Sequence, residues 1–181
     1  MNTPNLIAYC LLAVVLLIAA VTDFRRGKIY NWLTLPAILV GLMFWLIAGL
    51  AGSEKTALTS LFAFACASIP FGFLALRGWV GGGDAKLMAA VGALSASWEC
   101  VLGTALYGLI VSVVIAIVIM IHHGIVKETL RRIIGALLMT TARVKPDLEN
   151  PRHTVPFGAA VALGGLLAGA EHLLGWTLPW G

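Results

Sequence analysis

Six long runs of apolar residues, separated by short polar segments, dominate the pattern of the chain. They cover residues 5–21, 32–50, 57–76, 85–96, 101–121 and 155–174. About 20 apolar residues in a helix cross a bilayer core about 30 Å thick, so the runs predict an all-α, polytopic membrane protein with about six transmembrane helices. We expect residues 1–181 to form a single membrane domain. The fourth run is shorter and rich in Gly and Ala, which predicts a tilted or partly inserted helix packed against its neighbours.

The segment from residue 127 to residue 143 has a different pattern. Three cations, Lys127, Arg131 and Arg132, interrupt apolar residues that recur every three or four positions. This pattern predicts a cytoplasmic amphipathic helix that lies in the membrane interface with its cations toward the lipid headgroups. A helix that only joins two spans and a helix that guides a substrate are equally compatible with it.

The composition excludes an ordinary soluble fold. Hydrophobic residues make up 60% of the chain and charged residues 11%, whereas soluble domains have about 45–50% and about 25%. The net charge of +4 would suggest a nucleic-acid partner in a soluble protein. In a membrane protein the same cations mark topology, so we expect no nucleic-acid partner.

The placement of the cations predicts which ends of the helices face the cytoplasm. If the N-terminus lies outside, eleven of the twelve Lys and Arg residues fall on the cytoplasmic side and only Lys55 falls outside. The run 5–21 has no Lys or Arg before it and Arg25, Arg26 and Lys28 after it, so we expect a retained first span rather than a cleaved secretory signal. We therefore expect both termini to lie outside.

Two acidic residues stand beside apolar runs on this predicted cytoplasmic side. Asp23 follows the first run, and Asp84 follows the three glycines 81–83 at the start of the fourth. Taken singly, Asp23 is compatible with a surface ion pair to Arg25 or Arg26, and Asp84 with the N-cap of a helix. A phosphate-binding loop would need Gly-Lys-Ser/Thr, which does not follow the glycines.

A pair of aspartates is suited to hydrolysis. Two carboxylates that lie close together share one proton, so one serves as a base toward water and the other as an acid toward a scissile carbonyl. Ionisable groups at membrane depth are costly, which makes them candidates for function. We therefore predict that Asp23 and Asp84 form the catalytic pair of an aspartyl peptidase that uses no metal and no cofactor. The chain has no Gly-x-Ser-x-Gly or His-Glu-x-x-His motif, and its four His residues are too scattered for a metal site.

Three motifs of the chain resemble those of the type IV prepilin peptidases, which are intramembrane aspartyl proteases. The second aspartate of that family follows Gly-x-Gly, as in Gly81-Gly82-Gly83-Asp84, and the next residues, Ala85-Lys86-Leu87, also match. The first motif runs from an aspartate through a basic stretch to Ile-Pro-Asn. Asp23, Ile29 and Asn31 match it, but Tyr30 replaces the proline. The last run opens with Pro156-Phe157-Gly158, which is similar to a Pro-Phe-Gly element of the family.

The resemblance implies roles for individual residues. Asp23 and Asp84 would be catalytic. The residues implied to bind substrate or support the site are Gly81, Gly83, Lys86, Asn31, Pro156 and Gly158. Gly83 would let the substrate or a facing helix approach the backbone, and it would allow a positive φ that β-branched residues adopt poorly.

The resemblance also implies a substrate. It would be a prepilin with a short basic leader and a hydrophobic helix, cut after a glycine at the cytoplasmic membrane face. Larger members of the family carry paired Cys-x-x-Cys motifs linked to N-methylation, and this chain has none. It therefore resembles the compact branch that serves tight-adherence (Flp-type) pili, and we expect no methyltransferase activity.

Membrane lipid is the other expected partner, and the sequence leaves open whether the protein forms a homo-oligomer. The alternatives to a prepilin peptidase are a related peptidase for preflagellin or other signal-peptide substrates and, less favoured, a small proton or cation transporter.

Overall fold

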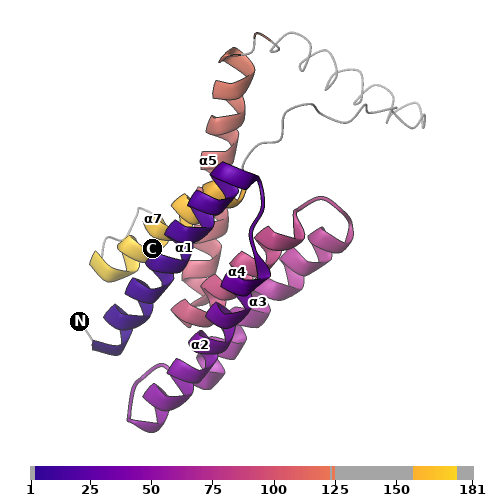
Figure 1. The fold of residues 1–181 in the computed structure, drawn as a ribbon. Helices are drawn as coiled ribbons and strands as arrows, with labels where there is room; N and C mark the ends of the chain where they lie inside the picture. Colours follow the sequence, from indigo (N-terminus) through magenta and orange to yellow (C-terminus); the bar gives the residue numbers. More distant parts are fainter. Residues whose placement is uncertain (1–2, 123, 125–156, 175–181) are drawn as a thin grey trace. The chain divides into compact units, whose positions relative to one another are not determined.

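A computed structural model describes residues 3–122, 124 and 157–174, and within these ranges the chain forms six α-helices and no strand (Figure 1). The helices are α1 (Thr3–Arg26), α2 (Asn31–Leu50), α3 (Ala57–Leu76), α4 (Gly82–Ser95), α5 (Trp98–His122) and α7 (Phe157–Leu174). They confirm the predicted all-α fold, and they match the apolar runs to within a few residues at most ends. The predicted amphipathic helix at 127–143 lies outside the described residues.

Four helices of the described ranges are long and apolar enough to cross a membrane, namely α1, α2, α3 and α5. The apolar α7 is shorter. Large apolar side chains such as Leu39, Ile69 and Val118 are exposed on these helices. A water-soluble surface rarely carries so much contiguous apolar area, whereas a bilayer covers it. The protein is therefore a polytopic membrane protein, as predicted.

The helix α4 is buried among its neighbours. Every residue from Leu87 to Ser95 is buried, and α4 contacts α1, α2, α3 and α7. Gly41 of α2 and Gly92 of α4 permit this packing: a Cβ atom at Gly41 would lie 2.7 Å from the backbone of Ala93, and one at Gly92 would overlap with Ala63 of α3. The prediction that the fourth run packs against its neighbours is confirmed. Its length of 14 residues corresponds to about 21 Å of helix, which is less than the bilayer core thickness of about 30 Å.

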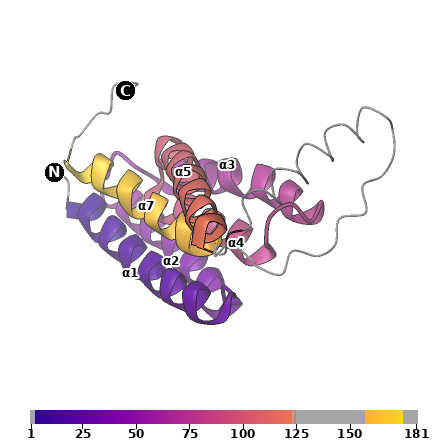
Figure 2. The ribbon, with the colours of Figure 1, turned by 90° about the horizontal axis from the view of Figure 1, so that it is seen from above.

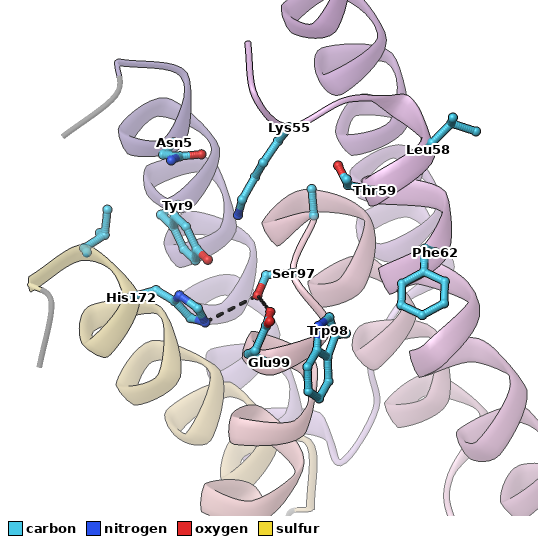
Figure 3. Close-up of a pocket in the computed structure, with 12 residues that line it drawn as sticks. Asn5, Tyr9, Lys55, Leu58, Thr59, Phe62, Ser97, Trp98, Glu99 and His172 are labelled. Atoms are coloured by element: carbon cyan, nitrogen blue, oxygen red, sulfur yellow. Dashed lines mark hydrogen bonds between the residues drawn. The ribbon is translucent and has the colours of Figure 1, made fainter. Parts of the chain in front are cut away.

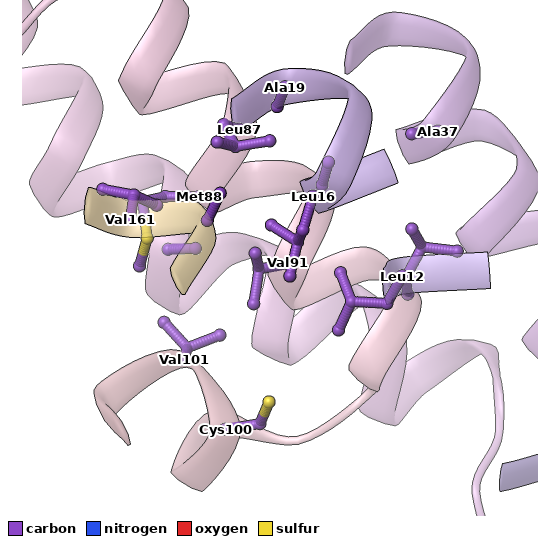
Figure 4. Close-up of a cluster of buried hydrophobic side chains, with 14 of the residues drawn as sticks. Leu12, Leu16, Ala19, Ala37, Leu87, Met88, Val91, Cys100, Val101 and Val161 are labelled. Atoms are coloured by element: carbon purple, nitrogen blue, oxygen red, sulfur yellow. The ribbon is translucent and has the colours of Figure 1, made fainter. Parts of the chain in front are cut away.

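The hydrophobic core lies around α4. Leu12 and Leu16 of α1, Leu87 and Val91 of α4, and Val161 of α7 meet in one buried cluster (Figure 4). On α1 the buried residues recur at steps of three and four, the spacing of one helix face. This face packs on α4 and α7, and Figure 2 shows α1 and α7 running side by side.

The carboxyl end of α4 is buried, so its last carbonyl groups need partners from other segments. Trp45 Nε1 donates to Leu94 O at 2.8 Å, Ser60 Oγ to Ala93 O at 2.7 Å and Lys55 Nζ to Ser95 O at 2.8 Å. Side chains of α2, of α3 and of the loop between them therefore cap α4 and hold its position along the bundle.

The chain divides into two compact units. The first comprises Met1–Ser112 and Pro156–Gly181 and holds α1 to α4, the first part of α5 and α7. The second, Val113–Val155, contributes the rest of α5 to the described residues. Both sites described below lie within the first unit. The expectation of a single domain stays a prediction.

Candidate active site

Asp23 is buried at the carboxyl end of α1, with 7% of its surface exposed. It continues the buried face of Leu12, Leu16 and Ala19, because α1 extends beyond the apolar run to Arg26. Its Oδ2 accepts a hydrogen bond of 2.9 Å from the backbone N–H of Ala159 in the first turn of α7. Free N–H groups at a helix N-terminus commonly bind anions in this way. A surface ion pair with the following arginines is therefore not the state of Asp23 in the structure.

Asp84 occupies the first turn of α4 and is half-buried. The N-cap of α4 is Gly81, so the interpretation of Asp84 as the N-cap is wrong. The carboxylate instead folds back toward Gly81, whose backbone forms a hydrogen bond with it, and a Cβ atom at Gly81 would lie 2.7 Å from Asp84 Oδ2. A glycine at this position therefore leaves room for the carboxylate.

The two aspartates converge on Gly158, the second residue of α7. A Cβ atom added at Gly158 would lie 2.9 Å from Asp84 Oδ1 and 3.0 Å from Asp23 Cγ. Since both atoms lie within 3.0 Å of one point, their separation cannot exceed twice that distance. Three segments far apart in the sequence thus bring two carboxylates together at a position that only glycine fits.

The electrostatics of Asp84 follow from this geometry. Asp84 lies outside the four candidate spans, in the first turn of the shorter α4. Burial and the neighbouring charge of Asp23 raise the pKa of Asp84 to about 6, although its hydrogen bond with the Gly81 backbone acts in the opposite direction. A carboxyl group with such a pKa is available as a proton donor in weakly acidic to neutral water.

A pocket of about 330 Å³ opens beside the two carboxylates. It is lined by Asp23, Gly27, Lys28, Ile29, Tyr30, Asn31, Gly81, Gly83 and Asp84. Lys86 Nζ donates to Asn31 Oδ1 at 2.8 Å, which ties the start of α4 to the start of α2. The pocket and the two carboxylates together have the components of a hydrolytic site.

Gly83 lies directly against the segment between α1 and α2. A Cβ atom at Gly83 would lie 3.0 Å from Ile29 Cβ and 3.2 Å from Ile29 O. Gly83 thus permits a close approach by the segment between α1 and α2, whereas the expected approach by a substrate or a facing helix stays a prediction. The expectation of a positive φ is wrong, because Gly83 has helical geometry within α4 and is not among the positive-φ glycines.

The structure brings together most of the residues that the sequence singled out. Asp23, Asp84, Gly81, Gly83 and Asn31 line the pocket. Lys86 binds Asn31, and Gly158 lies against both acids. Pro156 lies outside the described residues. Tyr30, which replaces the proline of the resembled motif, is the N-cap of α2 and accepts a hydrogen bond of 2.9 Å from Arg26.

Sequence reasoning missed two participants. Ala159 acts through its backbone N–H, which no side-chain motif can reveal, and its only signal was its position just after Pro156-Phe157-Gly158. Ile29 was known only as a motif residue, yet it packs against Gly83 and Gly158. Within the described residues, no group of three or more His, Cys, Asp or Glu side chains could hold a metal ion.

The fold and the site define a helical membrane protein with two carboxylates converging at one end of its bundle. Residues 10–125, which include both aspartates, match the model of the type IV leader peptidase family, and the chain belongs to this family. Membership of this family indicates that the protein is a peptidase of the type IV leader peptidase kind. The matched range ends before Gly158. No curated protein and no solved structure matched the chain.

Proposed function

We propose that the protein is a membrane-embedded aspartyl endopeptidase that removes the leader peptide of prepilins, with Asp23 and Asp84 as its catalytic pair. The observation that carries this proposal is the convergence of the two carboxylates on Gly158. Membership of the type IV leader peptidase family supports the same kind of reaction. No metal and no cofactor take part in it.

The geometry suits a division of roles between the two acids. Asp84, with its raised pKa, gives its proton to the scissile carbonyl oxygen while Asp23 takes a proton from the attacking water. The water oxygen bonds to the carbonyl carbon and forms a tetrahedral diol. Asp23 then returns its proton to the leaving nitrogen as the C–N bond breaks, and Asp84 recovers a proton from the diol as the new carboxyl forms. Each round consumes one water and leaves both acids as they began.

The other residues of the site would place the substrate. Gly81 and Gly158 leave space at the carboxylates, Gly83 lets Ile29 approach, and the hydrogen bond between Lys86 and Asn31 ties the start of α4 to the start of α2. Pro156 would be a further supporting residue. The substrate entering this space would be an extended peptide beside a glycine, followed by a hydrophobic helix in the lipid.

The proposed setting is the bacterial inner membrane, with the aspartates at the cytoplasmic face and both termini outside. The substrate would be a Flp-type prepilin, whose basic leader stays at the cytoplasmic face. The predicted segregation of eleven of twelve cations to that side supports the orientation.

The proposal is tested by co-expressing the protein with a Flp-type prepilin, a type IVa prepilin and a preflagellin, and following leader removal by gel mobility. Removal of the Flp-type leader alone, or faster than the others, supports the proposal. Preferential cleavage of preflagellin would transfer the assignment to the alternative peptidase. Failure to cleave any substrate, together with proton flux in liposomes, would support the transporter instead.

A further inference from the structure

A second and larger pocket lies at the end of the first unit opposite to the aspartates (Figure 3). Its volume is about 870 Å³. The start of α1, the loop between α2 and α3, the start of α3, the two residues between α4 and α5, the start of α5 and the end of α7 all contribute to it. Tyr9 in this pocket and Asp23 are 14 positions apart on α1, which corresponds to about 21 Å. The pocket is thus separate from the candidate active site.

Lys55 places a positive charge in the pocket. Its ammonium donates to Ser95 O at 2.8 Å and lies 5.6 Å from the ring centroids of both Tyr9 and Trp45. An ammonium group has three N–H donors, so the bond to Ser95 O leaves two for a ligand. Burial lowers the pKa of its ammonium group, although the charge of Glu99 acts in the opposite direction. The group would be better stabilised by an anion.

A negative charge stands on another wall of the same pocket. Glu99, which is exposed, accepts a hydrogen bond of 2.7 Å from Ser97 Oγ. The same Ser97 Oγ lies 3.3 Å from His172 Nε2. A carboxylate has about four acceptor positions, so Glu99 retains most of its capacity for a cationic donor. The pocket therefore offers one cation and one anion on different elements.

Tyr9 forms the wall of the pocket next to Lys55. The side chain is 4% exposed, and its hydroxyl is buried beside the Cys100 thiol of α5. Figure 3 shows the ring between Lys55 and His172, with the hydroxyl directed toward Ser97 and Glu99. The ring therefore shapes the wall of the pocket beside the Lys55 ammonium group.

The rim of the pocket is apolar and exposed. Leu58 and Phe62 lie one turn apart on α3, with 76% and 60% of their surfaces exposed, and Trp98 at the start of α5 is 48% exposed. All three line the pocket, and the α3 pair continues onto the apolar surface of a candidate span. A ligand with a polar head in the pocket could therefore extend its chains along this surface into the lipid.

We propose that this pocket binds the headgroup of a zwitterionic phospholipid with a phosphate and a primary ammonium group, such as phosphatidylethanolamine. Lys55 holds the phosphate oxygens, Glu99 receives the ammonium, and the acyl chains follow Leu58 and Phe62. A headgroup of both charges matches the one cation and one anion of the pocket, whereas a purely anionic lipid would meet Glu99 unfavourably. The site is independent of the proposed peptidase chemistry.

Native mass spectrometry of the detergent-purified full chain tests the proposal, with phosphatidylethanolamine and phosphatidylglycerol of the same acyl chains as probes. We expect one bound phosphatidylethanolamine, held about tenfold or more tightly than phosphatidylglycerol. Lys55→Gln should weaken both lipids about tenfold. Glu99→Gln should remove the preference between them, because it removes the partner of the ammonium only. Glu99 is exposed and its amide replacement still accepts from Ser97, so this variant should fold even if Lys55→Gln, which loses a cap of α4, does not.

Two matched variants and a soluble competitor complete the test. Glu54→Gln removes an exposed acid next to Lys55, and Arg77→Gln removes a cation at the far end of α3; both should bind lipid like the parent. Glycerophosphoethanolamine should compete weakly because it lacks the acyl chains. Equal binding of the two lipids, unchanged selectivity in Glu99→Gln, or competition by the soluble headgroup at the lipid's own concentration would each overturn the proposal.

Discussion

The two ends of the first unit hold different combinations of charged residues. At one end Asp23 and Asp84 lie close together, and the nearby cations bind neutral groups: Arg26 donates to Tyr30 and Lys86 to Asn31. At the other end Lys55 and Glu99 bring opposite charges into one pocket, each already held by a hydrogen bond. Two carboxyl groups held close together are costly, and folds tolerate them mainly where function needs them. The comparison agrees with the two proposals, that the aspartate end carries the chemistry and that the Lys55 end binds lipid.

The largest effect is expected from the aspartates. Asp23→Asn and Asp84→Asn should each reduce prepilin cleavage by about 10²–10⁴-fold or more, because each removes one member of the acid–base pair. Membrane insertion should be unchanged. Gel mobility of a co-expressed prepilin measures the cleavage. Asp147→Asn and Glu149→Gln, in a polar stretch of the sequence, serve as controls and should retain most activity. Substantial cleavage by either aspartate variant would remove the basis for the comparison.

Gly83→Val should be nearly as damaging, although it changes no titratable group. Its Cβ would lie 3.0 Å from Ile29 Cβ, and the two further methyl groups would force α4 away from the segment that follows Asp23. Gly83→Ala should reduce activity less, since its single methyl group requires Ile29 to shift by only a few tenths of an ångström. The cleavage rates of the two purified variants on the same prepilin measure the difference. A normal rate for Gly83→Val would show that the close approach is dispensable.

Gly158→Ala should lower the cleavage rate by about tenfold or more, because its methyl group would occupy the space between the carboxylates and push them apart. Gly82→Ala is the matched control within the glycine motif, since a Cβ atom there meets nothing within 4 Å. The loss should fall on kcat more than on KM, because the acids rather than the binding surface are displaced. Equal behaviour of the two variants would contradict the convergence at Gly158.

The pH profile should show the raised pKa of Asp84. If Asp84 donates the first proton, kcat/KM should fall as the pH rises above about 6, where this carboxyl group ionises. The decline should approach tenfold per pH unit well above that value. Steady-state rates on a prepilin peptide in detergent measure it. A rate that keeps rising from pH 6 to pH 8 would assign the proton donor to another group.

The smallest effect is expected at the opposite end of α4. Ser60→Ala removes the hydroxyl that caps Ala93 O and should lower the unfolding free energy by about 1–3 kcal/mol, since the carbonyl stays buried without that donor. Cleavage below the melting temperature should be nearly unchanged. Ser68→Ala, on the same helix, removes a buried hydroxyl that has no partner among the described residues, so it should not destabilise. Thermal unfolding in detergent distinguishes the two. Equal losses would show that the cap does not support α4.

The local pattern of the sequence was sufficient to predict the six described helices and to single out the two acids that lie close together in the structure. Runs of apolar residues about 20 positions long predict spans because the bilayer thickness sets that length. The acids stood out because charged residues are rare beside such runs. The short fourth run was recognisable as a helix held by its neighbours, since its Gly and Ala content suits close packing.

Only the tertiary structure decided how these parts meet. The bond from Ala159 to Asp23 joins residues 136 positions apart, and the contact of Ile29 with Gly83 depends on how α4 is seated among α1, α2 and α3. The sequence predicted that Lys55 is the one cation outside. It did not predict that Lys55 caps α4 and lines a pocket with Glu99 and Tyr9. The physical reason is that lipid tails are as apolar as a helix interface, so hydropathy alone cannot tell which face of a span packs on another helix. That choice rests on the fit of side chains from distant segments, which a local pattern does not contain.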